Sequence, residues 1–255
     1  MAASAFAKGI LYGINLSLGA DTALTPNVRV GMDTGYSTNH VGVSARGSKA
    51  SITAGHVGGY VYGSFDAVRV SAGLGYGFGD ASVNRAVSFT GFTDATSSSQ
   101  GADTFQFFAE AGYAFTMPSY TLEPFAGIDW TTLNMGAFRE AGGSAALAGT
   151  GKRMEQATTT FGLALSVPMD GMITPSFRAG LQHAISNDTA SRALSFVSSG
   201  QSFTVLGTPL DADRAVIDAN LGFNLGGARL MAGYSGAFGT RTTDHAIKAM
   251  AAVDF

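Results

Sequence analysis

The chain has 255 residues, a net charge of −3, 35 glycines and no cysteine. Charged residues make up 13% against a usual ~25%, while aromatic residues reach 11%, which excludes a disordered chain. The lack of cysteine excludes a disulfide scaffold or a zinc ribbon, and the acidic balance argues against a nucleic-acid partner.

The N-terminal segment, residues 1–8, lacks the basic and apolar regions of a signal peptide. We expect a stub there, either a linker or part of a first strand, followed by one domain over 9–255. Apolar runs are interrupted every two or three residues, so no stretch reaches the ~20 residues that a membrane-spanning helix needs. If the protein is exported, its signal belongs to a longer precursor.

The first predicted element covers 9–24, where apolar and polar residues alternate. Ile10, Tyr12 and Ile14 occupy even positions, while Gly13 and Asn15 occupy odd ones. A strand places these two sets on opposite faces, whereas a helix would scatter them. The segment exceeds the ~5–6 residues usual in soluble sheets and suits a strand that crosses a bilayer obliquely.

Ten further segments show the same strand-like alternation. They are 28–38, 51–64, 67–79, 104–116, 120–134, 157–168, 172–185, 215–226, 228–239 and 244–255. One of them, 51–64, is ambiguous, because Tyr60 and Tyr62 fall on one face while Val57 and Val61 fall on the other. The pattern predicts eleven strands and no second domain.

The predicted connections alternate between short and long. Short turns follow residues 24, 64, 116, 168 and 226, whereas Gly/Ser/Thr-rich loops are expected over 39–50, 80–103, 135–156, 186–214 and 239–243. Tight turns at one end and long loops at the other are typical of an outer-membrane barrel.

The polar face of these strands consists of Gly, Ser, Asn and isolated charges of both signs. In a membrane barrel such a face lines the lumen while aliphatic residues meet lipid, whereas a soluble barrel buries its aliphatic face. The soluble arrangement stays open as the alternative. Candidate pore-lining residues are Arg29, Asp33, Arg69, Glu110, Glu123, Asp129, Arg178, Asp218, Arg229 and Lys248.

The ordered series of segments resembles the autotransporter β-domain. The stretch GINLSLGADTALTPNVRVGMDTGYS is similar to its second and third strands, and FFAEAGYAF, LEPFAGIDW, ITPSFRAGLQHAISND and the terminal Phe255 continue the match. The resemblance implies an all-β, transmembrane antiparallel barrel of twelve strands. It further implies an outer-membrane translocator of type V secretion in a Gram-negative bacterium.

The resemblance also implies partners and an assembly signal. The partners are outer-membrane lipid, the barrel-assembly machinery and the protein's own passenger domain, which lies N-terminal to the barrel. The last strand, with Val253 and Phe255 on its apolar face, would be the signal that the machinery reads, since an exposed edge strand can pair with another sheet. A monomer without cofactor, metal or catalytic residue is expected.

The start of the chain departs from the family pattern. Eleven antiparallel strands leave the first and last strand parallel, so they cannot close as an all-antiparallel barrel. Residues 2–9 form a stunted twelfth strand, or the fragment begins inside the domain, or the segment 9–24 is misread.

Functions other than export fit the same strand pattern. A small passive pore or an adhesin barrel is the main alternative. The neighbours Asp244 and His245 suggest a third function, an outer-membrane hydrolase with an acid–base pair. Strand alternation, however, places these two side chains on opposite faces. Self-cleavage inside the lumen is less favoured than a pore-lining role for Glu110, Asp129 and Asp218. No nucleophile-elbow, zinc-protease or phosphate-loop motif is present.

Overall fold

The computed structural model describes residues 10–43, 47–169, 172–187, 191–207 and 211–253, and most of them belong to β-strands. Eleven strands form one antiparallel path. They are β1 (Ile10–Thr25), β2 (Val28–Val43), β3 (Ser48–Phe65), β4 (Val68–Phe89), β5 (Phe92–Tyr113), β7 (Thr121–Met135), β11 (Lys152–Ser166), β12 (Ile173–Asn187), β15 (Asp213–Asn224), β16 (Ala228–Phe238) and β17 (Thr243–Val253). The eleven predicted strands are therefore confirmed.

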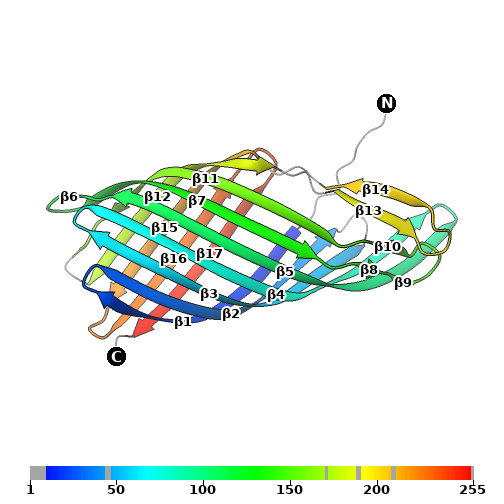
Figure 1. Cartoon of the computed structure of the whole chain (residues 1–255), viewed down its shortest axis with the longest axis horizontal. Helices are drawn as coiled ribbons and strands as arrows, with labels where there is room; N and C mark the ends of the chain where they lie inside the picture. The colour runs from blue at the N-terminus through cyan, green and yellow to red at the C-terminus, as the bar shows by residue number, and fades with distance from the viewer. Residues whose placement is uncertain (1–9, 44–46, 170–171, 188–190, 208–210, 254–255) are drawn as a thin grey trace.

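The main sheet is curled, with its later strands lying behind the earlier ones (Figure 1). Each strand pairs with its neighbour along the chain, and the two-residue strands β6 (Phe115–Thr116) and β9 (Ala141–Gly142) attach to β7 and β5. Strands β1 and β17 form the two ends of the path and do not pair with each other in the described chain. Because the path has an odd number of antiparallel strands, these two edges run in the same direction.

The expectation of a long loop over 80–103 is wrong. Strands β4 and β5 continue their ladder up to the pair Phe89 and Phe92, where Gly91 has a φ of 82° in the turn. The sequence pattern predicts a loop here because the segment is rich in Ser, Thr and Gly. A two-stranded ribbon outside a membrane can be polar on both faces, so this composition does not stop pairing.

Two other predicted loops also contain strands. A separate four-stranded sheet, called the small sheet below, has the order β14-β13-β10-β8. It consists of β8 (Phe138–Arg139), β10 (Leu147–Gly149), β13 (Ser191–Phe196) and β14 (Ser202–Leu206). The segments 135–156 and 186–214 thus meet at one end of the main sheet. The predicted loops 39–50 and 239–243 shrink to short connections after β2 and β16.

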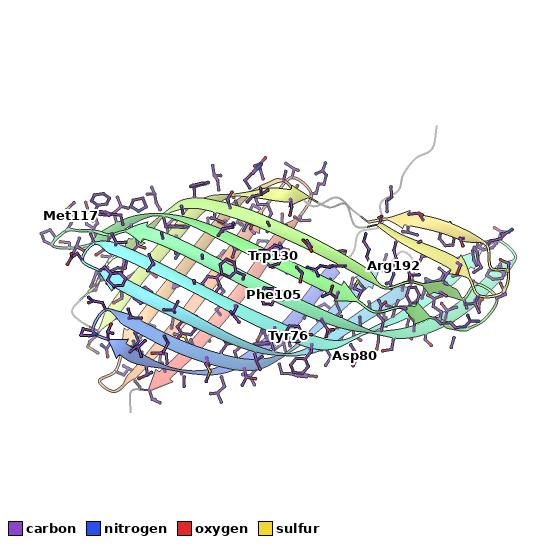
Figure 2. The ribbon with its side chains drawn as sticks, viewed as in Figure 1. Tyr76, Asp80, Phe105, Met117, Trp130 and Arg192 are labelled. Atoms are coloured by element: carbon purple, nitrogen blue, oxygen red, sulfur yellow. The ribbon has the colours of Figure 1, made fainter. Side chains whose placement is uncertain are left out.

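The outer face of the main sheet carries an apolar belt. On β4 it runs from Val68 to Phe78 and stops at Asp80, which matches the ~9–11 residues of a tilted membrane strand. Large apolar residues are exposed along it, with Leu18 at 77% and Ile247 at 91%. Tyr76, Phe105 and Trp130 lie on neighbouring strands of this wall (Figure 2), as expected for an aromatic girdle.

The described residues contain no large side chain that is fully buried. A soluble barrel would fill its interior with its aliphatic face, so the soluble alternative is wrong for this chain. No helix among the described residues combines the length and the apolarity needed to span a bilayer.

Candidate functional site

All ten residues predicted to line a pore lie on one face of the main sheet. Directly paired residues in adjacent strands point to the same side, and one such row runs from Arg29 through Tyr62, Ser71 and Glu110 to Gly127. Arg29 and Glu110 both belong to this row, and the strand period of two, carried through the remaining ladders, places the other eight on the same face. The register also resolves β3, whose Tyr60 and Tyr62 join the polar face while Val57 and Val61 face outward.

The polar face is the concave, inner face. Arg178 on β12 donates a hydrogen bond to Glu110 on β5 at 2.6 Å, although β7 and β11 lie between these strands. Three strand spacings amount to about 14 Å on a flat sheet. The two side chains therefore meet because the sheet curves around them.

Aromatic rings also occupy the inner face, which the sequence reasoning missed. The guanidinium of Arg178 lies 4.1 Å from the ring centroid of Phe125, a residue only 7% exposed. Phe108 covers Gly73, where an added Cβ would come within 2.4 Å of the ring. The pairing of a large side chain with a glycine on the next strand was the signal in the sequence.

Most charges on the inner face are paired. Arg29 contacts Asp21, Lys248 lies 3.4 Å from Asp218, and Arg69 lies 3.9 Å from Glu123. Asp33 faces His56 on β3 at 3.7 Å. Charges of opposite sign therefore compensate one another in these pairs.

Two further predicted residues, Asp129 and Arg229, are placed by a cavity and by the strand register. Asp129 borders a small cavity of about 230 Å³ that Glu110, Arg178 and Asp218 also line. Arg229 is opposite Asn224 in the ladder of β15 and β16. The structure thus gathers four of the predicted acids and bases around one hollow of the inner face.

Polar contacts attach the small sheet to the extended β4–β5 hairpin. Arg85 donates two hydrogen bonds to Glu140, at 3.0 and 2.6 Å, and a third to the carbonyl of Ala145. The Leu147 N–H also donates to Glu140. Burial raises the pKa of Glu140, but the Arg85 guanidinium and the Leu147 N–H outweigh it and hold this pKa below its ordinary value.

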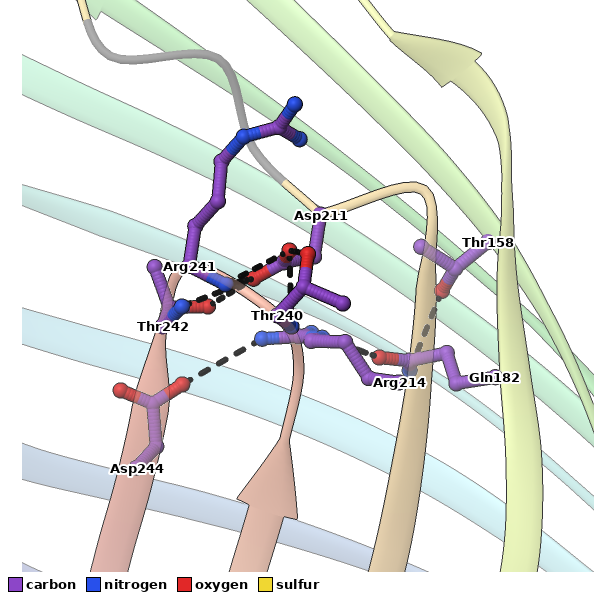
Figure 3. A network of polar contacts seen from close by, with 8 residues as sticks. All are labelled: Thr158, Gln182, Asp211, Arg214, Thr240, Arg241, Thr242 and Asp244. Carbon is purple, nitrogen blue, oxygen red and sulfur yellow. Dashed lines mark hydrogen bonds and ion pairs between the residues drawn. The ribbon is translucent and has the colours of Figure 1, made fainter.

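Asp211 organises the connection between β16 and β17 (Figure 3). Its carboxylate accepts hydrogen bonds from the hydroxyls and backbone N–H groups of Thr240 and Thr242, and from the Arg241 N–H. The two hydroxyl bonds, followed by the backbone bonds, hold the pKa of Asp211 well below its usual range. Nearby, Arg214 links Gln182 to Asp244.

The structure separates the residues considered for catalysis. Asp244 pairs with Arg214 on the inner face, while His245 contacts the hydroxyl of Tyr234 at 2.7 Å on the outer face. An acid–base pair needs both side chains within hydrogen-bond reach of one substrate. In the described part of the chain, no three His, Asp or Glu side chains form a group suited to a metal ion.

The predicted assembly signal is described in part. Val253 ends β17 and is 67% exposed, whereas Phe255 lies outside the described residues. The N-terminal segment 1–8 lies outside them as well.

Comparison with solved structures shows the same fold. The structure matches the translocator domain of the autotransporter NalP from Neisseria meningitidis with a TM-score of 0.81 and 17% identity, over 97% of this chain and 82% of that one. It matches the transport unit of the autotransporter AIDA-I from Escherichia coli with a TM-score of 0.65 and 15% identity, over 97% of this chain and 84% of that one. The β-domain of the Bordetella autotransporter Brka matches with a TM-score of 0.62 and 18% identity, over 97% of this chain and 91% of that one.

Comparison with curated proteins gives relatives far longer than this chain. An extracellular serine protease of Serratia marcescens is 28% identical over 169 residues, which is 65% of this chain and 16% of the protease. A second extracellular serine protease of that species is 27% identical over 175 residues, again 16% of its length. The model of the family described as autotransporter beta-domain matches residues 11–235, most of the sequence, and the chain therefore belongs to the autotransporter β-domain family.

Proposed function

We propose that this chain translocates a passenger domain of its own polypeptide across the outer membrane and carries out no chemical reaction itself. Autotransporter β-domains are outer-membrane proteins of Gram-negative bacteria, and this chain is one of them. One observation carries the proposal: a continuous polar inner face with mixed charges lies behind a continuous apolar outer belt.

The ten charged residues named above would line the path of the passenger. Their charges are largely compensated by neighbours, as in the pairs Arg178–Glu110 and Lys248–Asp218. A surface with compensated charges binds a passing polypeptide weakly whatever its sequence. That property suits transport better than a field of one sign, which would retain oppositely charged segments.

The last strand would serve as the signal for the barrel-assembly machinery. In the described chain β17 pairs with β16 on one side and leaves its other edge unpaired. Such an edge can add a strand of another sheet, with Val253 and Phe255 supplying the apolar face. We propose a single domain over 9–255 that acts as a monomer in the membrane.

Surface display tests the proposal. The chain is expressed behind a signal peptide and a reporter passenger, and the reporter is labelled with antibody on intact cells. We expect labelling of the surface together with heat-modifiable migration of the barrel on a gel. A barrel that inserts and shows this migration, but leaves the reporter in the periplasm, would contradict translocation.

A further inference from the structure

A cavity of about 330 Å³ lies between the small sheet and the inner face of the main sheet. The main sheet contributes Val83, Ser98, Gln100, Met135 and Met154, all from the ends of β4, β5, β7 and β11 that extend beyond the apolar belt. The small sheet covers them with Phe138, Leu194 and Val205. The volume falls within the ~300–1,000 Å³ typical of pockets for small molecules.

The packing around Gly149 shapes the small-sheet wall of this cavity. Phe138, Gly149 and Leu194 lie side by side in the register of β8, β10 and β13. A Cβ added at Gly149 would come within 2.5 Å of Phe138 and 2.9 Å of Leu194. The glycine lets the two apolar side chains come together and form one wall of the cavity.

Two cations, Lys152 and Arg192, border the cavity. Among the described residues, Lys152 and Arg192 take part in no ion pair, and Glu140, which also borders the cavity, already binds Arg85. Arg192 lies 4.5 Å from the ring centroid of Phe138 and donates to the carbonyls of Gly136 and Thr150. Burial lowers the pKa of Arg192.

Gln100 adds a polar group that the protein leaves unsatisfied. Its side-chain oxygen is buried and meets no hydrogen-bond donor in the described chain. An unpaired buried acceptor costs free energy, and an anion, which has no proton to donate, does not remove this cost while the oxygen faces it. Rotation of the terminal amide would turn its NH₂ group, a double donor, toward a bound anion.

We propose that this cavity binds a medium-chain aliphatic carboxylate. The acyl chain occupies the space between Met135, Met154 and Leu194, and the carboxylate accepts hydrogen bonds from Lys152 and Arg192. An apolar lining with two cations that no described carboxylate pairs fits an amphiphilic anion, because a neutral chain leaves the cations uncompensated and a small anion leaves the apolar walls empty. This site does not depend on passenger export.

Photolabelling tests the assignment. Decanoate carrying a diazirine at the end of its chain is irradiated with the protein in amphipol, and labelled residues are mapped by mass spectrometry. We expect labels on Met135, Met154 or Leu194, competed by free decanoate but not by decanol. Lys152→Gln should reduce this labelling about tenfold, and Lys152→Arg should restore it.

A matched control uses the exposed Lys49 on the outer side of β3. Lys49→Gln should leave the labelling unchanged, and heat-modifiable migration shows that each variant is folded. Labels confined to the outer belt, equal competition by decanol, or unchanged labelling in a folded Lys152→Gln protein would each overturn the proposal.

Discussion

The main sheet and the small sheet are both antiparallel, but different forces hold them. Strands of the main sheet share ladders of ten residues or more, such as those joining β4 to β5 and β11 to β7. The pairing of β10 with β13 involves three residues and that of β8 with β10 involves two. The small sheet therefore depends on side-chain contacts such as Arg85–Glu140, whereas the main sheet depends on its backbone and on lipid.

The difference shows which features a local sequence pattern can specify and which depend on contacts between distant segments. Alternation along a strand selects its lipid face regardless of its partners. The small sheet instead joins residues that lie far apart in the sequence, and its position follows from a few hydrogen bonds. We expect changes in the main sheet to shift global stability and changes in the small sheet to act locally.

The largest expected effect is that of a charge in the apolar belt. Leu74 lies on the outer face of β4 and is 58% exposed to what would be lipid. Leu74→Arg should lower the free energy of unfolding in lipid vesicles by about 2–4 kcal/mol, because an arginine near the bilayer midplane loses its hydration. Ser71→Arg, on the inner face of the same strand, is the control, and an equal loss there would contradict the assigned faces.

Glu140→Gln should loosen the small sheet by about 1–3 kcal/mol, because Arg85 then loses its charged partner. The side chain of Glu140 is 5% exposed, so water compensates little. Protease cleavage within 136–151 should accelerate while the midpoint of global unfolding stays unchanged. A midpoint that falls with the cleavage rate would show that the two sheets unfold as one unit.

Arg178→Met should destabilise the barrel by about 1–2 kcal/mol, since Glu110 loses a charge-assisted hydrogen bond and Phe125 loses its cation. Both charged side chains are partly exposed, which keeps the effect below that of a fully buried pair. Unfolding in vesicles measures it. The double variant with Glu110→Gln should cost less than the sum of the single changes, and simple additivity would argue against the contact.

The smallest expected effect is a local dependence on pH at Asp211. A carboxyl group whose pKa is lower in the folded state contributes stability above its unfolded pKa of about 3.9, and this stability is lost as the pH falls toward the folded value. The protection of the Thr240–Thr242 amides, measured against the exchange of an unstructured peptide at the same pH, should therefore fall below about pH 4. In Asp211→Asn this protection should already be low at neutral pH and no longer change with acid; an unaltered profile would refute the role of Asp211.

Sequence reasoning predicted the main sheet well and the small sheet poorly. The eleven strands and the side on which Glu110, Arg178 and Lys248 lie followed from a period of two, which depends on the backbone alone. The composition of 80–103 was misleading, because Ser and Thr are common both in loops and in polar β-ribbons. The inner-face ring of Phe125 was missed because its role depends on Arg178, two strands away in the sheet.

The sequence by itself determined an all-β membrane domain, because alternation places apolar side chains toward lipid independently of the remaining fold. The tertiary structure decided which charges meet, since the pairing of Arg178 with Glu110 requires the curvature of four strands. It also decided the position of the small sheet and the cavity beneath it. Both arise from contacts between segments that no local pattern connects, and they exist only once the main sheet has brought those segments to one end.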